Sequence, residues 1–87
     1  MRLNRTRGDV LWMRAHFDGR LRVEIRGADA AACVVLVRRG DEPIREARLA
    51  VAADAARPAA DEITREIYPH ECSAQCGAWV AMDPARR

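Results

Sequence analysis

The sequence predicts an α+β fold: a small, curled antiparallel sheet of about four to five strands with one helix packed on it. Three observations support this fold. Several segments alternate apolar and polar residues, breaks rich in Gly, Asp and Pro separate them at hairpin spacing, and one later segment has apolar residues at helical spacing. The expected order is β-β-β-β-α-β in one domain, because 87 residues suffice for a single core.

The first two strands are expected at residues 9–17 and 20–26. In the second strand, Leu21, Val23 and Ile25 alternate with charged residues, which is the clearest strand pattern in the chain. In the first strand one face carries Leu11, Met13, Ala15 and Phe17, and the other carries Val10, Trp12, Arg14 and His16.

Asp18-Gly19 marks the turn between these strands. A two-residue loop would pair His16 with Leu21 and so mix polar and apolar side chains on one face. The alternation instead favours a three-residue loop, with Gly19 in the left-handed position of a bulged turn and His16 opposite Arg20. The apolar sets of both strands would then share one face.

Two further strands and a helix should follow. Residues 31–38 contain the apolar run Cys33–Val37 and are expected to form a strand that is covered on both faces. Residues 44–52 fit a helix capped by Asp41, but their alternation and the short hairpin connection favour a strand.

The remaining elements are a helix at 58–68 and a short strand at 78–82. Pro58 suits a first helical turn and Pro69 ends the helix, and its apolar stripe is Ala60, Ile63 and Ile67. Residues 1–8 are expected to form a loose basic arm and 83–87 a polar tail, which leaves 9–82 as the folded domain.

Charge and composition exclude several classes of protein. All 15 basic residues are arginine, which together with abundant alanine indicates GC-rich codon usage, and the net charge is only +2, too small for a general nucleic-acid binder. Residues 1–26 carry seven arginines against three acids, and residues 41–71 carry eight acids against four arginines. No signal peptide or membrane span is expected, and three cysteines favour a reducing cytoplasm.

The outer face of the first hairpin is the predicted partner-binding surface, because tryptophan and arginine are enriched at binding hot spots. Its residues are Trp12, Arg14, His16, Arg20, Arg22 and Arg26. A secondary acidic patch on and after the helix could contact a basic partner or a second copy of the chain. It consists of Asp61, Glu62, Glu66 and Glu71.

One segment contains residues that bind metals. His70, Cys72 and Cys76 could supply three zinc ligands, and Cys33 or His16 would have to supply a fourth. The spacing matches no strong zinc signature, and a Cys72–Cys76 disulfide or redox pair is an alternative. Since small buried thiols and a loop histidine are the more ordinary interpretation, no metal or other cofactor is expected.

Catalysis is not expected, because the chain has no Gly-rich phosphate loop and its one serine lies outside any nucleophile motif. The predicted function is a non-enzymatic interaction module that binds and regulates or inhibits a larger protein. In size, phage-encoded inhibitors of bacterial defence complexes fit this profile. The alternatives are nucleic-acid binding through the arginine and tryptophan face, and a small zinc or redox protein. A homodimer is expected in each case.

Overall fold

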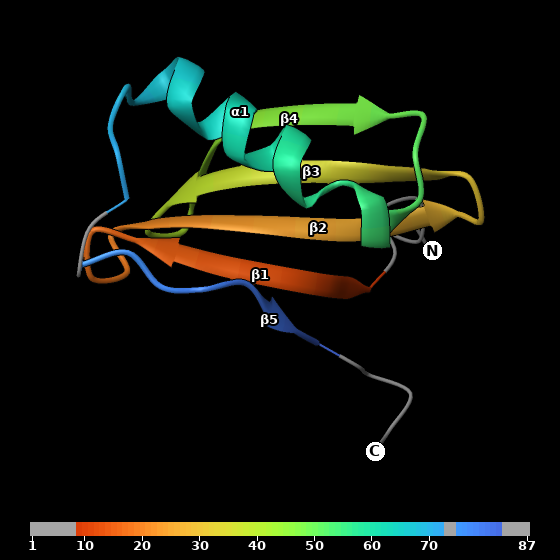
Figure 1. Ribbon diagram of the computed structural model, residues 1–87, viewed down its shortest axis with the longest axis horizontal. Helices are drawn as coiled ribbons and strands as arrows, with labels where there is room; N and C mark the ends of the chain where they lie inside the picture. Colours follow the sequence, from red (N-terminus) through yellow and green to blue (C-terminus); the bar gives the residue numbers. More distant parts are fainter. Residues whose placement is uncertain (1–8, 73–74, 83–87) are drawn as a thin grey trace.

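A computed structural model describes residues 9–72 and 75–82 and confirms the predicted α+β fold (Figure 1). Five antiparallel strands form one sheet in the order β4-β3-β2-β1-β5, and one helix lies on it. The strands are β1 (Val10–His16), β2 (Leu21–Asp29), β3 (Ala32–Arg39), β4 (Glu42–Leu49) and β5 (Val80–Ala81). The 3-10 helix η2 (Ala53–Ala55) precedes α1 (Arg57–Ile67). The predicted basic arm and polar tail lie outside the described residues.

The core lies between α1 and the sheet (Figure 1). From β2 and β3 it contains Leu21, Val23, Ile25, Cys33, Val35 and Val37. From η2, α1 and the residue between them it contains Ala53, Ala56, Ala60 and Ile63. Ala56 and Ala60 have no exposed surface. Their small side chains allow the helix backbone to approach the sheet closely. A helix of only 11 residues can therefore cover the apolar side chains of β2 and β3.

The ambiguous fourth segment is a strand, as the alternation predicts. Ala47 and Leu49 of β4 pair with Val35 and Cys33 of β3 and pack against the core. The helix also agrees with the prediction: Ala60 and Ile63 of the predicted stripe are buried, Ile67 packs against the core while partly buried, and Thr64 beside them is buried. No helix among the described residues is long and apolar enough to cross a bilayer.

The predicted register of the first hairpin is wrong. His16 pairs with Leu21, Arg14 with Val23, and Trp12 with Ile25. Directly paired residues point to the same face. The polar residues of β1 therefore lie on the face that α1 covers, beside the apolar residues of β2, whereas Met13 and Ala15 lie on the opposite face.

The turn sequence explains this register. Phe17, Asp18 and Gly19 all adopt left-handed backbone conformations, with φ of 56°, 56° and 91°. The values at Asp18 and Gly19 are those of the two central residues of a type I′ turn, for which Asp-Gly is a preferred sequence. The turn chemistry thus favours the observed register, against the apolar alternation on which the prediction relied.

The chain after α1 returns along the free edge of β1. Backbone hydrogen bonds run from Asp18 N to Gln75 O, from Gly77 N to Ala15 O and from Met82 N to Leu11 O, each 2.8 Å long. β5 then pairs with the middle of β1. This segment carries Cys76 and lies beside the end of β1 where His16 stands.

Candidate metal centre

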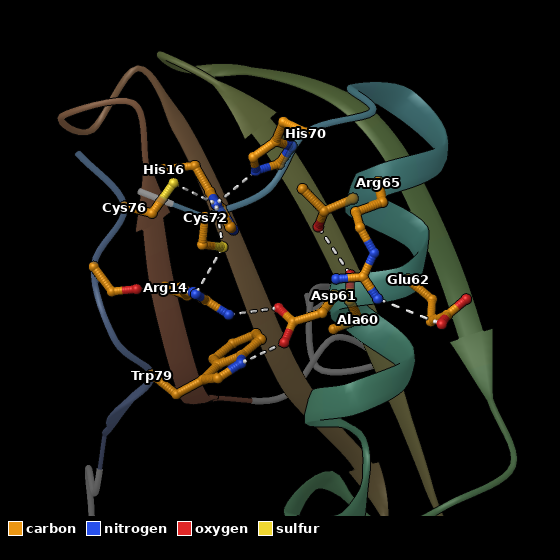
Figure 2. Close-up of polar contacts among 12 residues, drawn as sticks. Arg14, His16, Ala60, Asp61, Glu62, Arg65, His70, Cys72, Cys76 and Trp79 are labelled. Atoms are coloured by element: carbon orange, nitrogen blue, oxygen red, sulfur yellow. Dashed lines mark hydrogen bonds and ion pairs between the residues drawn. The ribbon is translucent and has the colours of Figure 1, made fainter. Parts of the chain in front are cut away.

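Two imidazoles and two thiols converge at the end of the sheet where β1 turns into β2 (Figure 2). His16 is the last residue of β1, and the other three residues follow α1: His70, Cys72 and Cys76. One ligand atom from each residue lies within 4.8 Å of the ligand atoms of the others. These four residues are called the His–Cys cluster below.

The distances from His16 Nδ1 to the other three ligand atoms are close to those in a tetrahedral zinc site. His16 Nδ1 lies 3.4 Å from His70 Nε2, 3.4 Å from Cys76 Sγ and 3.9 Å from Cys72 Sγ. Zinc binds nitrogen at about 2.0–2.1 Å and sulfur at about 2.3 Å, so tetrahedral edges are about 3.3 Å between nitrogens and about 3.6 Å between nitrogen and sulfur. His16 Nδ1 therefore stands close to the distance that a shared ion requires from each of the other three ligand atoms, and all four atoms lie within 4.8 Å of one another.

His70 is oriented by a backbone carbonyl. Its Nδ1 is hydrogen-bonded to the carbonyl oxygen of Tyr68, and a carbonyl oxygen only accepts, so Nδ1 carries the proton. In the neutral ring the lone pair is then on Nε2, the atom that faces His16. Metal-binding histidines are typically held in this way, with the distal N–H donated to a backbone or carboxylate oxygen.

His16 is the buried member of the cluster, with only 1% of its surface exposed. Its Nδ1 faces the other ligands, whereas Nε2 is buried and has no hydrogen-bond partner among the described residues. Burial lowers the pKa of His16, and the Arg14 cation and His70 lower that pKa further. The neutral imidazole, which is the form that binds metal ions, is therefore favoured near pH 7.

The two cysteines of the cluster are free thiols that are more accessible. Cys72 is exposed and Cys76 is partly exposed. Burial around its sulfur raises the pKa of Cys72, and the Arg14 guanidinium opposes that change. A metal ion would bind the thiolate and release the proton, which makes the affinity of such a site depend on pH.

Arg14 connects the cluster to the helix and to the segment before β5 (Figure 2). Its Nη2 donates to Cys72 Sγ at 2.9 Å, its Nη1 to Asp61 Oδ1 at 3.0 Å, and its Nε to the carbonyl of Gly77 at 2.8 Å. Trp79 Nε1 donates to the second oxygen of Asp61 at 3.4 Å. Three donors of one planar guanidinium are thus used to hold three separate segments.

Of the two candidates for a fourth ligand, the structure brings His16 to the site and not Cys33. Cys33 lies in the core with no exposed surface, and burial raises the pKa of its thiol. The signal that could have selected His16 over Cys33 was the Asp18-Gly19 turn, because a type I′ turn places His16 opposite Leu21 and so on the covered face. Arg14, Asp61 and Trp79 were not predicted as parts of this site, and no spacing along the chain indicates their contacts.

The six predicted partner-binding residues do not share a surface. Trp12, Arg14 and His16 are on the face covered by α1, Arg22 and Arg26 are on the opposite face, and Arg20 is in the turn. Trp12 is held between β1 and the start of the helix, where its Nε1 donates to Asp54 at 3.1 Å and the Arg57 guanidinium lies 4.1 Å from the ring centroid. The expected common face is wrong, and a partner contact by any one of these residues stays a prediction.

The predicted acidic patch is also divided. Asp61 turns toward Arg14 and is only partly exposed, whereas Glu62 and Glu66 are exposed and pair with Arg65 and Arg45. Glu71 is exposed, and in the sequence it stands between His70 and Cys72 of the His–Cys cluster. Because arginines offset three of these four carboxylates, the patch carries less free charge than its sequence indicates.

Comparison with protein-family models, curated proteins and solved structures finds no match for this chain. The functional conclusion therefore depends on the geometry of the site alone.

Proposed function

We propose that this protein is a small zinc-binding domain in which the ion has a structural role. The observation that carries the proposal is the convergence of His16, His70, Cys72 and Cys76, whose ligand atoms all lie within 4.8 Å of one another, with His16 Nδ1 3.4–3.9 Å from the other three. Mixed imidazole and thiolate ligands in a tetrahedron suit zinc better than the harder ions, which prefer oxygen ligands.

Four protein ligands fill a tetrahedron and leave no position for a substrate or an activated water. A structural ion is therefore favoured over a catalytic one, which agrees with the expectation of a non-enzymatic protein. The ion would join β1, the segment after α1 and the segment before β5. Domains of this size bury a smaller fraction of their surface than larger domains do, so such a cross-link contributes a large part of their stability.

The proposal also favours the reducing cytoplasm that the cysteine count predicts, since the site needs free thiolates. A zinc-stabilised domain with no catalytic position would act by binding. Regulation of a larger protein, with nucleic-acid binding as the alternative, is thus retained as part of the proposal. Pull-down from host lysate with and without nuclease tests this part, because a protein partner survives the nuclease whereas a nucleic-acid bridge does not.

The metal site itself is tested by zinc content and by cobalt spectra of the untagged full-length protein. We expect one zinc per chain, and on cobalt substitution we expect the visible bands of a tetrahedral site with thiolate ligands. Cys72→Ser should lose most of this binding, because an exposed thiolate ligand is replaced without disturbing the core.

Cys33→Ala is the matched control, because it removes the one cysteine that lies outside the His–Cys cluster. Its metal content per folded chain should equal that of the unmodified protein. The proposal fails if the folded protein binds neither ion, or if Cys33→Ala and Cys72→Ser lose metal equally.

A further inference from the structure

A hollow of about 460 Å³ lies at the same end of the sheet as the His–Cys cluster. It is formed by the β1–β2 turn, the β3–β4 turn and the residue that follows α1, which meet at one end of the sheet (Figure 1). Its lining residues are Phe17, Arg20, Leu21, Arg39, Gly40 and Tyr68. We propose that this hollow binds a small planar aromatic anion.

The walls suit an aromatic ring. Phe17 and Tyr68 are both half-buried, with centroids 6.4 Å apart and ring planes at 74°. Leu21, which is 2% exposed, adds an almost fully buried apolar side chain. Aromatic and aliphatic walls with few polar groups are typical of small-molecule sites, and a planar ligand can pack against one aromatic face and the edge of the other.

The charged groups that line the hollow are both cations. Arg20 and Arg39 are exposed, and neither forms an ion pair with an acid in the described part of the chain. The Arg39 guanidinium lies 5.5 Å from the Tyr68 ring centroid, so its planar group stands next to an aromatic wall. Arginine recognises carboxylate, phosphate and sulfonate groups through paired N–H donors. The two arginines therefore indicate a ligand that carries such an anionic group.

The backbone at Phe17 supports a functional role for this wall. A bulky residue with φ of 56° is strained, because its Cβ crowds the backbone in the left-handed region. The ring is held in place by contacts with Tyr68 and with His70, whose centroid is 4.8 Å away. Strained residues that persist beside a hollow are characteristic of binding sites.

Both aromatic walls are connected to the His–Cys cluster. Phe17 follows His16 directly, and the carbonyl of Tyr68 accepts the hydrogen bond that orients His70. A bound ion would therefore fix both walls, and ligand binding should weaken when the metal is removed. This coupling depends on the proposed zinc site, whereas the composition of the hollow does not.

The test uses two fluorescent probes with the same ring system and the full-length protein as purified. Anilinonaphthalene sulfonate carries the anionic group, and phenylnaphthylamine lacks it. We expect the sulfonate to bind at least about tenfold more tightly, because hydrogen bonds to charged groups are the strong ones.

Arg39→Met should weaken sulfonate binding by about tenfold and leave the neutral probe unaffected. Arg22→Met is the matched control, because Arg22 is an exposed arginine on the opposite face of β2 and does not line the hollow. Circular dichroism verifies that each variant is folded. Equal binding of the two probes, or equal loss in both variants, would overturn the proposal.

Competition then identifies the source of the anionic group. Adenosine monophosphate displaces the sulfonate probe if the ligand is a nucleotide, and naphthoate displaces it if the ligand is an aryl carboxylate; either result supports the proposal. Displacement by inorganic phosphate alone, or by neither aromatic anion, would overturn it. Zinc uptake and probe binding separate the two proposals. Folded protein that takes up no zinc when zinc is supplied, but still binds the probe through Arg39, disproves the metal site and retains the hollow. Zinc uptake without arginine-dependent probe binding retains the metal site and disproves the hollow.

Discussion

The covered face of the sheet has an apolar half and a polar half. The apolar half is supplied by β2 and β3, where Val23, Ile25, Val35 and Val37 have no exposed surface. The polar half is supplied by β1, whose Trp12, Arg14 and His16 stand directly opposite residues of β2. The same short helix lies over the sheet, so one domain uses two different means of stabilisation side by side.

The two halves differ in how much stability is lost when one residue is substituted. Apolar burial is non-directional, and its contribution grows with the area removed from water. A buried polar group contributes only when its partner is present, and it costs about 1–3 kcal/mol when that partner is lost. A small domain that places an arginine and a histidine on its covered face therefore depends on specific contacts there, and the His–Cys cluster supplies them.

The largest effect is expected in the apolar half. Ile25→Ala should lower the free energy of unfolding by about 2–5 kcal/mol, because it removes a fully buried side chain and leaves a cavity. Zinc bound per folded chain should not change. Urea denaturation monitored by circular dichroism measures the first quantity, and metal analysis of the folded fraction measures the second.

Val80→Ala provides the control for this variant, because Val80 is 52% exposed and the substitution should change stability by less than about 0.5 kcal/mol. If Ile25→Ala also removed zinc from chains that remain folded, the two halves would not be separate. The division of the covered face would then be wrong.

A smaller and more specific effect is expected at Arg14. Arg14→Met keeps much of the side-chain volume but removes the donors to Cys72, Asp61 and Gly77, so zinc affinity should fall by about 10–100-fold. Competition with a chromophoric chelator measures the affinity. Arg14→Lys should recover only part of it, because an ammonium group cannot reproduce the planar set of donors.

Arg22→Met is again the matched control, because the neighbouring strand presents Arg22 on the opposite face. Its zinc affinity should equal that of the unmodified protein. An equal loss of affinity in both variants would assign the effect to net charge and not to the Arg14 contacts.

The apolar half is also the half that the sequence predicts well. The alternation in β2, the apolar run in β3 and the stripe of α1 identify strands, helix and core, because burial of area depends on the local pattern. The strand assignment of β4 was correct for the same reason. The limits of α1, Arg57–Ile67, differ by one residue at each end from the predicted 58–68.

The polar half is predicted poorly because its contacts are tertiary. The sequence indicates His70, Cys72 and Cys76 as possible ligands and offers His16 and Cys33 for the fourth position, but His16 is 54 residues away from His70, and no zinc signature of that spacing selects it over Cys33. The alternation predicts Arg14 and His16 on the solvent side, because polar residues usually face water. That general tendency fails where a specific site supplies buried partners, and the whole error follows from a register shift of one residue.

The smallest effect tests that register directly, at Asp18. In the structure Asp18 is exposed with φ of 56°, where glycine is favoured over alanine by about 1 kcal/mol. In the three-residue loop that the alternation predicts, Asp18 would be right-handed, and alanine would be favoured by about 0.5–1 kcal/mol. Denaturation of Asp18→Gly and Asp18→Ala therefore gives opposite orders of stability for the two registers. A more stable alanine variant would indicate the three-residue loop, which places Arg14 and His16 on the solvent face and is incompatible with the His–Cys cluster. A more stable glycine variant would support the register on which the metal centre depends.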